Sequence, residues 1–254
     1  MIVFSADEVR RETLALVIVT HFVDKLAWVK MGRETGEEKR RNVKGRKGKG
    51  EKMKVRVPLV LLATRLISSS SLAMTRPQMI VFDLDDCLWS PEMYTLPMCP
   101  TEPVREGELV IGVRCGSRGP TVKLFPEARV VLERIANGEF PDVMFGLASS
   151  SEEPSYSKSC LKNLEIKPGV TMESLFPFTA IGRTDGLTSR KTTHMARLKE
   201  QCPELDFKKC LFFDDCGWGD HVGDLNKALG VKGVRTPYGM TVEAFEEGLK
   251  MFAT

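Results

Sequence analysis

From Gln78 onward the sequence predicts an α/β domain in which a parallel sheet is flanked by helices. Short apolar runs typical of buried strands alternate along this part of the chain with segments of helical periodicity. Alternation of this kind favours a parallel sheet with helices on both of its faces. Ligands of such sheets bind at the carboxyl ends of the strands, so the residues that follow each strand are the first candidates for a site.

The elements can be assigned in chain order. We expect the first buried strand at residues 79–84, because the run MIVFDL is β-branched, aromatic and apolar. Residues 125–137 should form a helix, since Pro126 lies near its start and Gly138 follows its end. The same signals predict a strand at 143–148, a helix at 156–164, a short strand at 178–181, a helix at 191–201, a strand at 210–213, a helical turn at 226–229 and a last strand at 231–234.

A small flap is expected between the first strand and the first helix. This segment contains proline, glycine and an expected hairpin made of residues 109–113 and 121–124, and no large insertion accompanies it. We therefore predict a small flap and no large cap domain, which leaves the site open to bulky substrates. Trp89, Met93 and Tyr94 could pack on the substrate or inside the flap, and the sequence leaves both possibilities open.

Residues 1–73 differ in composition from the rest and are interpreted as a basic, disordered leader or a targeting segment. Lys and Arg dominate residues 39–56, and such a run cannot bury enough apolar surface to offset the entropy lost on ordering. No aromatic residue interleaves the run, so base stacking is unsupported and nucleic acid is not the expected partner. A nucleic-acid or acidic-membrane role for the run remains an alternative.

Two apolar stretches in the leader are too short to span a bilayer. Residues 14–23 carry His21 and residues 57–73 are interrupted by Arg65, whereas a spanning helix needs ~20 apolar residues. We therefore expect no membrane partner. If translation starts at Met53, the second stretch resembles an organelle-import or signal segment; a leader created by a misplaced start codon is the alternative.

The seven cysteines are odd in number and form no C-x-x-C pair, so their spacing indicates neither a zinc site nor a disulfide framework. A reducing compartment is the simpler interpretation. We expect a cytoplasmic protein, with an organelle as the alternative if Met53 is the true start.

Acidic residues end two of the predicted strands. Asp83 and Asp85 follow the first strand, two residues apart and so on one side of an extended chain, and the pair Asp214-Asp215 follows the strand at 210–213. Two such ends of one parallel sheet can converge on one cation. Buried carboxylates need a compensating positive charge, and a hard cation with oxygen ligands such as Mg²⁺ fits them.

The motifs resemble those of the haloacid dehalogenase superfamily. Its first motif is similar to D-L-D-D-C at residues 83–87, and its fourth to Asp214-Asp215 with Asp220 following. Within the superfamily, FDLDDCLW, LFPEA, LASSSEE, SRKTTHMARL, LFFDD and the closing GV…YGM…GLKMF together resemble the magnesium-dependent phosphatase-1 family over roughly residues 77–254. The resemblance implies a Rossmann-like fold of the haloacid dehalogenase type.

The resemblance also implies catalytic roles. Asp83 would attack the phosphoryl group, and Asp85 would protonate the leaving oxygen and then activate water. Lys191, rather than its neighbour Arg190, would neutralise charge on the phosphoryl group and hold Asp83. Substrate binding is assigned to the serine run after the second strand, of which the resemblance favours the first residue, and to an aromatic of the flap; the candidates are Ser149, Ser150 and Trp89.

A second set of implied roles concerns Mg²⁺. Asp83 would bind the metal through its other carboxylate oxygen, and Asp85 through its main-chain carbonyl. Asp215 is the foremost further ligand, and Asp214 and Asp220 would support the metal's shell. The fourth-motif loop is longer than is usual in the family, which weakens the assignment of Asp220. His194 could lie behind the site or simply pack in its helix, and His221 could be loop surface.

We expect a Mg²⁺-dependent phosphomonoesterase whose substrate is a phosphoprotein, with phosphotyrosine foremost, or a sugar phosphate. The alternatives are a phosphotransferase or mutase that uses the same aspartyl-phosphate, and a phosphate-binding module without turnover. Oligomeric state is not encoded in any recognisable pattern.

A chain shortened to begin at Met74 should fold and hydrolyse phosphate esters at an unchanged rate per site. Every predicted strand and every catalytic candidate follows that residue, and about 180 residues can bury a self-sufficient core. Melting temperature and Mg²⁺-dependent turnover of the short and full chains would be compared. A shortened chain that is insoluble or melts well below the full one would show that the leader packs on the domain.

Overall fold

The computed structural model describes residues 76–253. The leader at 1–73, its boundary at Met74 and its two apolar stretches lie outside the described residues. Among the residues that are described, no helix is long and apolar enough to cross a bilayer.

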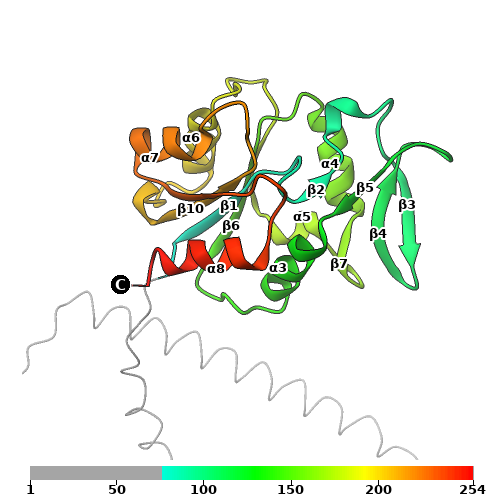
Figure 1. The fold of residues 1–254 in the computed structure, drawn as a ribbon, viewed down its shortest axis with the longest axis horizontal. Coiled ribbons are helices and arrows are strands. Elements are labelled where there is room, and N and C mark those ends of the chain that lie inside the picture. The colour runs from blue at the N-terminus through cyan, green and yellow to red at the C-terminus, as the bar shows by residue number, and fades with distance from the viewer. Residues whose placement is uncertain (1–75, 254) are drawn as a thin grey trace, which may run out of the picture. The chain divides into compact units, whose positions relative to one another are not determined.

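The centre of the domain is a five-stranded sheet in the order β11-β10-β1-β6-β9, with every neighbouring pair parallel (Figure 1). The predicted parallel sheet is therefore confirmed. Because β1 is central, the residues that follow β10, β1 and β6 emerge beside one another. The strands are β1 (Met79–Phe82), β6 (Met144–Ser149), β9 (Phe178–Ile181), β10 (Cys210–Asp214) and β11 (Lys232–Arg235).

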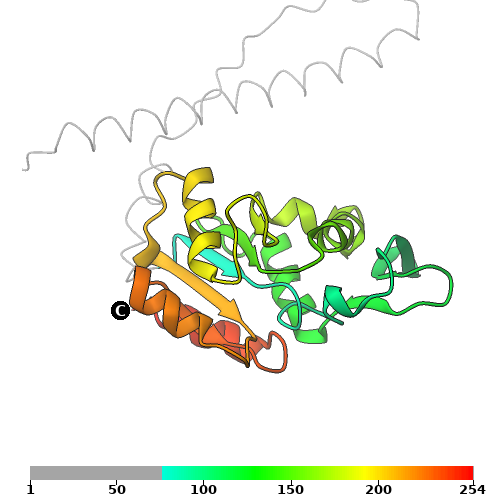
Figure 2. The same ribbon diagram turned by 90° about the horizontal axis from the view of Figure 1, so that it is seen from above.

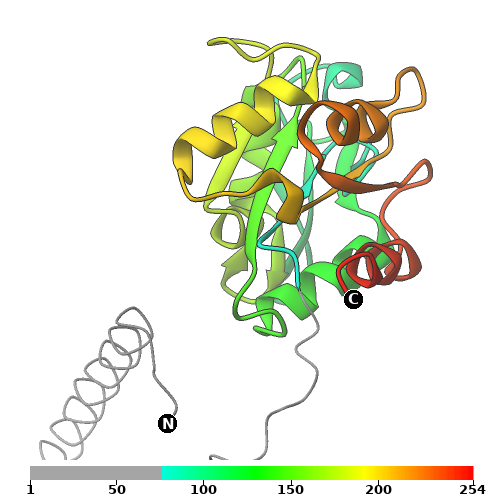
Figure 3. The same ribbon diagram turned by 90° about the vertical axis from the view of Figure 1, so that its left-hand side faces the viewer.

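Helices cover both faces of this sheet. Alternate side chains of β1 enter two separate cores: Ile80 and Phe82 pack in one, and Met79 and Val81 in the other. Figure 1 shows α3 and α8 on one side of the sheet and α6 and α7 on the other, and Figure 3 shows the same layers from the side. The helices are α3 (Pro126–Ala136), α4 (Pro154–Asn163), α5 (Met172–Leu175), α6 (Lys191–Gln201), α7 (His221–Leu229) and α8 (Val242–Lys250), with single 3-10 turns η1 (Met93–Thr95) and η2 (Phe207–Lys209).

Three stacked phenylalanine rings join helix α8 to the sheet. Phe82 and Phe213 lie in register on β1 and β10, with ring centroids 5.4 Å apart. Phe245 of α8 stacks on Phe213 at 5.8 Å and lies 6.4 Å from Phe82. Burial of large aromatic rings is a major part of core stability, so this stack fixes the two strands whose ends carry the acidic residues.

The flap is a four-stranded antiparallel sheet in the order β2-β5-β4-β3. Figure 2, viewed from above, shows it at the edge of the domain, away from α7 and α8. The expected hairpin is present as β4 (Leu109–Arg114) and β5 (Thr121–Leu124), and the structure adds β2 (Trp89–Ser90) and β3 (Glu102–Glu106). A further two-stranded ribbon consists of β7 (Glu165–Lys167) and β8 (Val170–Thr171).

Two expectations about the elements need correction. The helical turn expected at 226–229 is the end of the longer helix α7, which begins at His221 because the carboxylate of Asp220 accepts a hydrogen bond from the Gly223 amide and caps it. The first strand ends at Phe82 rather than at Leu84, since the ladder pairing with β10 and β6 ends there and a turn closed on the Leu84 carbonyl follows.

Candidate active site

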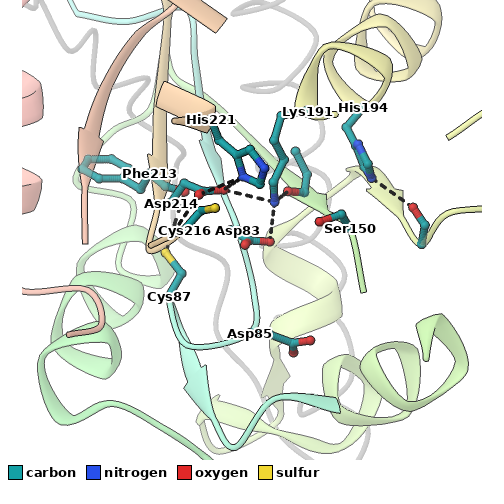
Figure 4. A network of polar contacts seen from close by, with 12 residues as sticks. Asp83, Asp85, Cys87, Ser150, Lys191, His194, Phe213, Asp214, Cys216 and His221 are labelled. Atoms are coloured by element: carbon teal, nitrogen blue, oxygen red, sulfur yellow. Dashed lines mark hydrogen bonds and ion pairs between the residues drawn. The ribbon is translucent and has the colours of Figure 1, made fainter. Parts of the chain in front are cut away.

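Side chains from three adjacent strand ends meet at one edge of the central sheet (Figure 4). Phe82 pairs with Phe213, so the next residues, Asp83 and Asp214, are neighbours. Strand β6 runs two residues past the partner of Phe82 and ends at Ser149. The sequence prediction that the acidic strand ends converge is therefore met by the register of the sheet.

Lys191 binds both carboxylates from the start of helix α6. Its Nζ lies 2.8 Å from Asp83 Oδ1 and 3.1 Å from Asp214 Oδ2, and donates a 2.8 Å hydrogen bond to the Ala148 carbonyl. Burial opposes the charged ammonium, but attraction by Asp83 and Asp214 outweighs it and raises the Lys191 pKa. Lys191 is 2% exposed, whereas Arg190 points to solvent, so the choice between the two cations agrees with the geometry.

Donor groups surround the Asp214 carboxylate. Besides Lys191, it contacts Nδ1 of His221 at 3.1 and 3.2 Å and accepts a 3.0 Å hydrogen bond from the Cys216 amide. Burial favours the neutral acid, but Lys191 and His221 together lower the Asp214 pKa. Asp214 is therefore an ionised support for Lys191.

Asp215 faces the cavity and lacks such partners. Burial, with repulsion from Asp83 and Asp214, raises its pKa to about 8. Carboxylate oxygens of Asp83, Asp214 and Asp215 lie within 4.8 Å of one another, with a single ammonium among them. This excess of negative charge and all-oxygen donor set fits a hard divalent cation, as the sequence predicted.

Asp85 lines the same cavity but is held by the flap. The Trp89 indole Nε1 donates a 2.7 Å hydrogen bond to one carboxylate oxygen, and the Met93 amide lies 3.3 Å from the other. Burial raises the Asp85 pKa to about 6 in spite of these hydrogen bonds. A carboxyl group with this pKa can exchange a proton near neutral pH.

A tight turn returns the chain so that Trp89 reaches Asp85. Asp86 adopts the left-handed conformation at φ 53°, and the amides of Leu88 and Trp89 both donate to the Leu84 carbonyl. Aspartate is among the few residues that tolerate this conformation, because its short polar side chain bonds locally.

The prediction that Trp89 binds substrate is wrong. Its side chain is fully buried and is absent from the cavity lining, because β2 pairs with β5 and turns the ring into the core. Met93 is equally buried, and of the three flap candidates only Tyr94 lines the cavity, with 60% of its surface exposed. Trp89 acts on the site through Asp85.

The cavity has a volume of ≈ 500 Å³ and opens beside the acidic cluster. Ser149 and Ser150, both predicted to bind substrate, line it next to Asp83. At its rim Arg183 forms a 2.7 Å ion pair with Glu152. The remaining lining residues are Asp85, Glu92, Tyr94, Ser151, Ser189, Asp215, Cys216, Trp218 and His221.

Of the two histidines in the described residues, His194 agrees with one of its sequence alternatives and His221 does not. His194 packs inside helix α6, with Nε2 3.0 Å from the Gly182 carbonyl, as its packing alternative proposed. His221 is buried against Asp214 rather than at the loop surface, and sequence reasoning missed it. Asp220, expected near a metal, instead caps α7. The sequence signal that could have placed His221 in a helix was Asp220 immediately before it, a residue type that often caps helix starts.

Comparison with known proteins gives one family match. A family model described as Acid Phosphatase matches residues 75–254. No curated protein matches the chain.

Several solved structures are similar at low identity. The N-terminal part of protein BF1531 from Bacteroides fragilis, containing a phosphatase domain complexed with Mg, is 13% identical over 71% of this chain with a TM-score of 0.45, and this chain spans 42% of its length. CbbY from Rhodobacter sphaeroides in complex with phosphate is 12% identical over 68% of this chain and 99% of the CbbY chain, with a TM-score of 0.41. The haloacid dehalogenase-like family protein SP0104 from Streptococcus pneumoniae is 13% identical over 68% of this chain and 90% of the SP0104 chain, with a TM-score of 0.42.

Replacement of Trp89 by phenylalanine should raise the pKa of Asp85 above its present value of about 6. The indole donates to the ionised carboxylate and so lowers this pKa; losing the donor favours the protonated acid. Carboxyl-carbon NMR titration of labelled aspartate, assigned with Asp85→Asn, would measure the change. Trp218→Phe is the matched control, because Trp218 is exposed and makes no bond to Asp85. A downward or absent shift in Trp89→Phe would contradict the assignment.

Lys191→Met should destabilise the domain by ~3–5 kcal/mol, because it leaves Asp83 and Asp214 buried without their cation. Arg190→Met should change the free energy of unfolding by less than ~0.5 kcal/mol, since Arg190 is exposed. Urea denaturation of both variants at neutral pH would decide the ranking, and the reverse order would show that Lys191 is not the central cation.

Proposed function

Because the chain belongs to the acid phosphatase family, we propose that it is a Mg²⁺-dependent phosphomonoesterase that acts through an aspartyl-phosphate on Asp83. The family match agrees with the phosphatase class that the haloacid dehalogenase-type motifs predicted. We propose further that its relatives within the superfamily are the phosphatases of the magnesium-dependent phosphatase-1 type.

The observation that carries the mechanism is the position of Asp83. It lies at the carboxyl end of the central strand, beside the cavity, with one carboxylate oxygen held by Lys191. Its other oxygen would attack phosphorus, forming the Asp83–phosphorus bond while the bond from phosphorus to the leaving oxygen breaks. A carboxylate nucleophile divides a difficult displacement into two easier ones.

Asp85 would act as the general acid of the first step and the general base of the second. In its acid form it would protonate the leaving oxygen; as the resulting carboxylate it would accept a proton from the water that attacks phosphorus and releases phosphate from Asp83. A pKa of about 6 suits both duties near neutral pH, because neither protonation state is costly to reach. Its two hydrogen bonds from Trp89 and Met93 keep the carboxyl group fixed at the cavity wall.

Phosphoryl transfer depends mainly on alignment and on neutralisation of spread negative charge. Lys191 supplies one fixed positive charge, and Ser149 and Ser150 lie where they can hydrogen-bond the phosphoryl oxygens. Mg²⁺, when bound, would supply the further positive charge that the phosphoryl group needs. Its binding residues would be Asp83, Asp215 and the main-chain carbonyl of Asp85, with Asp214 supporting them through Lys191.

The substrate would be bulky and carry an accessible phosphate. The four-stranded flap leaves the cavity open, and two aromatic side chains on its rim, Tyr94 and Trp218, are 60% and 72% exposed. Such rings can pack on the aromatic ring of phosphotyrosine or on the apolar face of a sugar phosphate. We therefore retain a phosphoprotein, with phosphotyrosine foremost, or a sugar phosphate as the substrate class.

Asp83→Asn should abolish Mg²⁺-dependent hydrolysis and prevent formation of any phosphoenzyme, and Asp85→Asn should slow turnover ~10²–10⁴-fold by removing the acid and base. Asp86→Asn is the matched control: it lies outside the cavity lining, and asparagine tolerates the same left-handed backbone. Turnover would be measured on phosphotyrosine, sugar phosphates and a chromogenic ester, before and after metal removal by a chelator. Near-normal activity of Asp83→Asn with Mg²⁺ present would refute the mechanism.

A further inference from the structure

A second group of side chains able to bind a metal shares Asp214 with the acidic cluster. Asp214, Cys216 and His221 are all buried, and a carboxylate oxygen, the thiol sulfur and an imidazole nitrogen of the three lie within 4.8 Å of one another. They come from the single loop that joins β10 to α7. Cysteine spacing along the sequence gave no sign of this group, because a single cysteine contributes to it.

We propose that Asp214, Cys216 and His221 form a binding site for a zinc-class transition metal, distinct in chemistry from the oxygen-only Mg²⁺ cluster. Thiolate and imidazole ligands select softer divalent metals, whereas Mg²⁺ prefers oxygen donors. Zinc is known to be bound by three protein ligands with its fourth coordination position left open.

The distances fit a metal ion. Two ligand atoms at zinc–nitrogen and zinc–oxygen bond lengths with a tetrahedral angle lie ~3.3 Å apart. Nδ1 of His221 lies 3.1 and 3.2 Å from the two carboxylate oxygens of Asp214, so the pair needs little movement to share one ion.

The side chains of Cys216 and His221 both lie close to Gly219 of the same loop. A Cβ atom at Gly219 would lie 3.6 Å from Cys216 Sγ and 3.9 Å from His221 Cδ2. The Trp218 ring meets the imidazole edge-on at 5.0 Å and restricts its orientation. The ligands are therefore positioned by the loop rather than drawn from separate mobile segments.

The site is also accessible. Cys216 and His221 both line the ≈ 500 Å³ cavity, so an ion can enter from it, and a water molecule can take the fourth position. On binding, the Cys216 thiol would lose its proton to solvent, and the neutral imidazole would offer one nitrogen to the metal while keeping its proton on the other. The net change is one metal ion bound and one proton released.

A metal ion bound at this site would affect the nucleophile through Asp214. The same carboxylate binds Lys191 at 3.1 Å, and Lys191 in turn holds Asp83. A metal on Asp214 would compete with the Lys191 ammonium for this carboxylate and repel it, and so would displace Lys191 from its position beside Asp83. Zinc should therefore inhibit turnover; this consequence, unlike the binding itself, depends on the proposed phosphatase activity.

Cobalt(II) titration of the reduced full chain tests binding without reference to activity. With Mg²⁺ in excess to fill the oxygen cluster, wild type should bind one cobalt per chain with thiolate-to-cobalt charge-transfer absorption in the near ultraviolet, and Zn²⁺ should remove that absorption. Cys216→Ser should abolish it, whereas Cys99→Ser, which changes a partly buried thiol outside the group, should retain it. Absence of the band in wild type, or its persistence in Cys216→Ser, would overturn the proposal.

His221→Gln provides the second variant and should weaken cobalt binding at least ~10-fold, since even loss of an outer-shell partner costs ~10–100-fold. Zinc inhibition would then be measured with each variant's own zinc-free rate as reference, and Cys216→Ser should be less sensitive than wild type. Zinc that binds through Cys216 without slowing turnover would refute the link to Lys191. A chain without any phosphatase activity would refute the proposed function but leave the cobalt result to decide the metal site.

Discussion

One buried ammonium group holds the strand ends of this domain together. Asp83 and Asp214 follow adjacent parallel strands, and two ionised carboxylates at that separation repel each other unless a cation lies between them. Lys191 supplies the cation from the first turn of helix α6 and is fixed further by the Ala148 carbonyl of β6. Strands β1, β6 and β10 and a helix from the next layer therefore meet at one charged atom. The same ammonium that stabilises the acidic edge also holds Asp83, which lines the cavity.

Much of this arrangement follows from sequence. Buried parallel strands are continuous apolar runs, which is why the five central strands were expected within one or two residues of their observed bounds. Convergence of the acidic residues then follows from the rule that ligands gather at the carboxyl ends of such strands. Selection of Lys191 over Arg190 came from family resemblance, because helical periodicity alone does not say which of two adjacent cations turns inward.

The features that sequence did not predict depend on contacts between distant segments. Strand β3 is polar and contains Pro103, so it lacks a strand signal, and it pairs with β4 alone. The interior position of Trp89 depends on a left-handed turn at Asp86, and aspartate at that position is compatible with many other turns. His221 looked like loop surface because its partner, Asp214, is reached only when the loop folds back on the strand end.

The hydrogen bond from Trp89 to Asp85 shows that the site is built from two structural units, the central sheet and the flap. Lys191 and Asp83 belong to the central sheet and its helices, where any displacement disturbs the charge balance of the core. Asp85 takes its immediate surroundings from the flap, which packs through a separate small sheet. Changes in the sequence of the flap would therefore shift the pKa of Asp85 and leave the contacts among Lys191, Asp83 and Asp214 as they are.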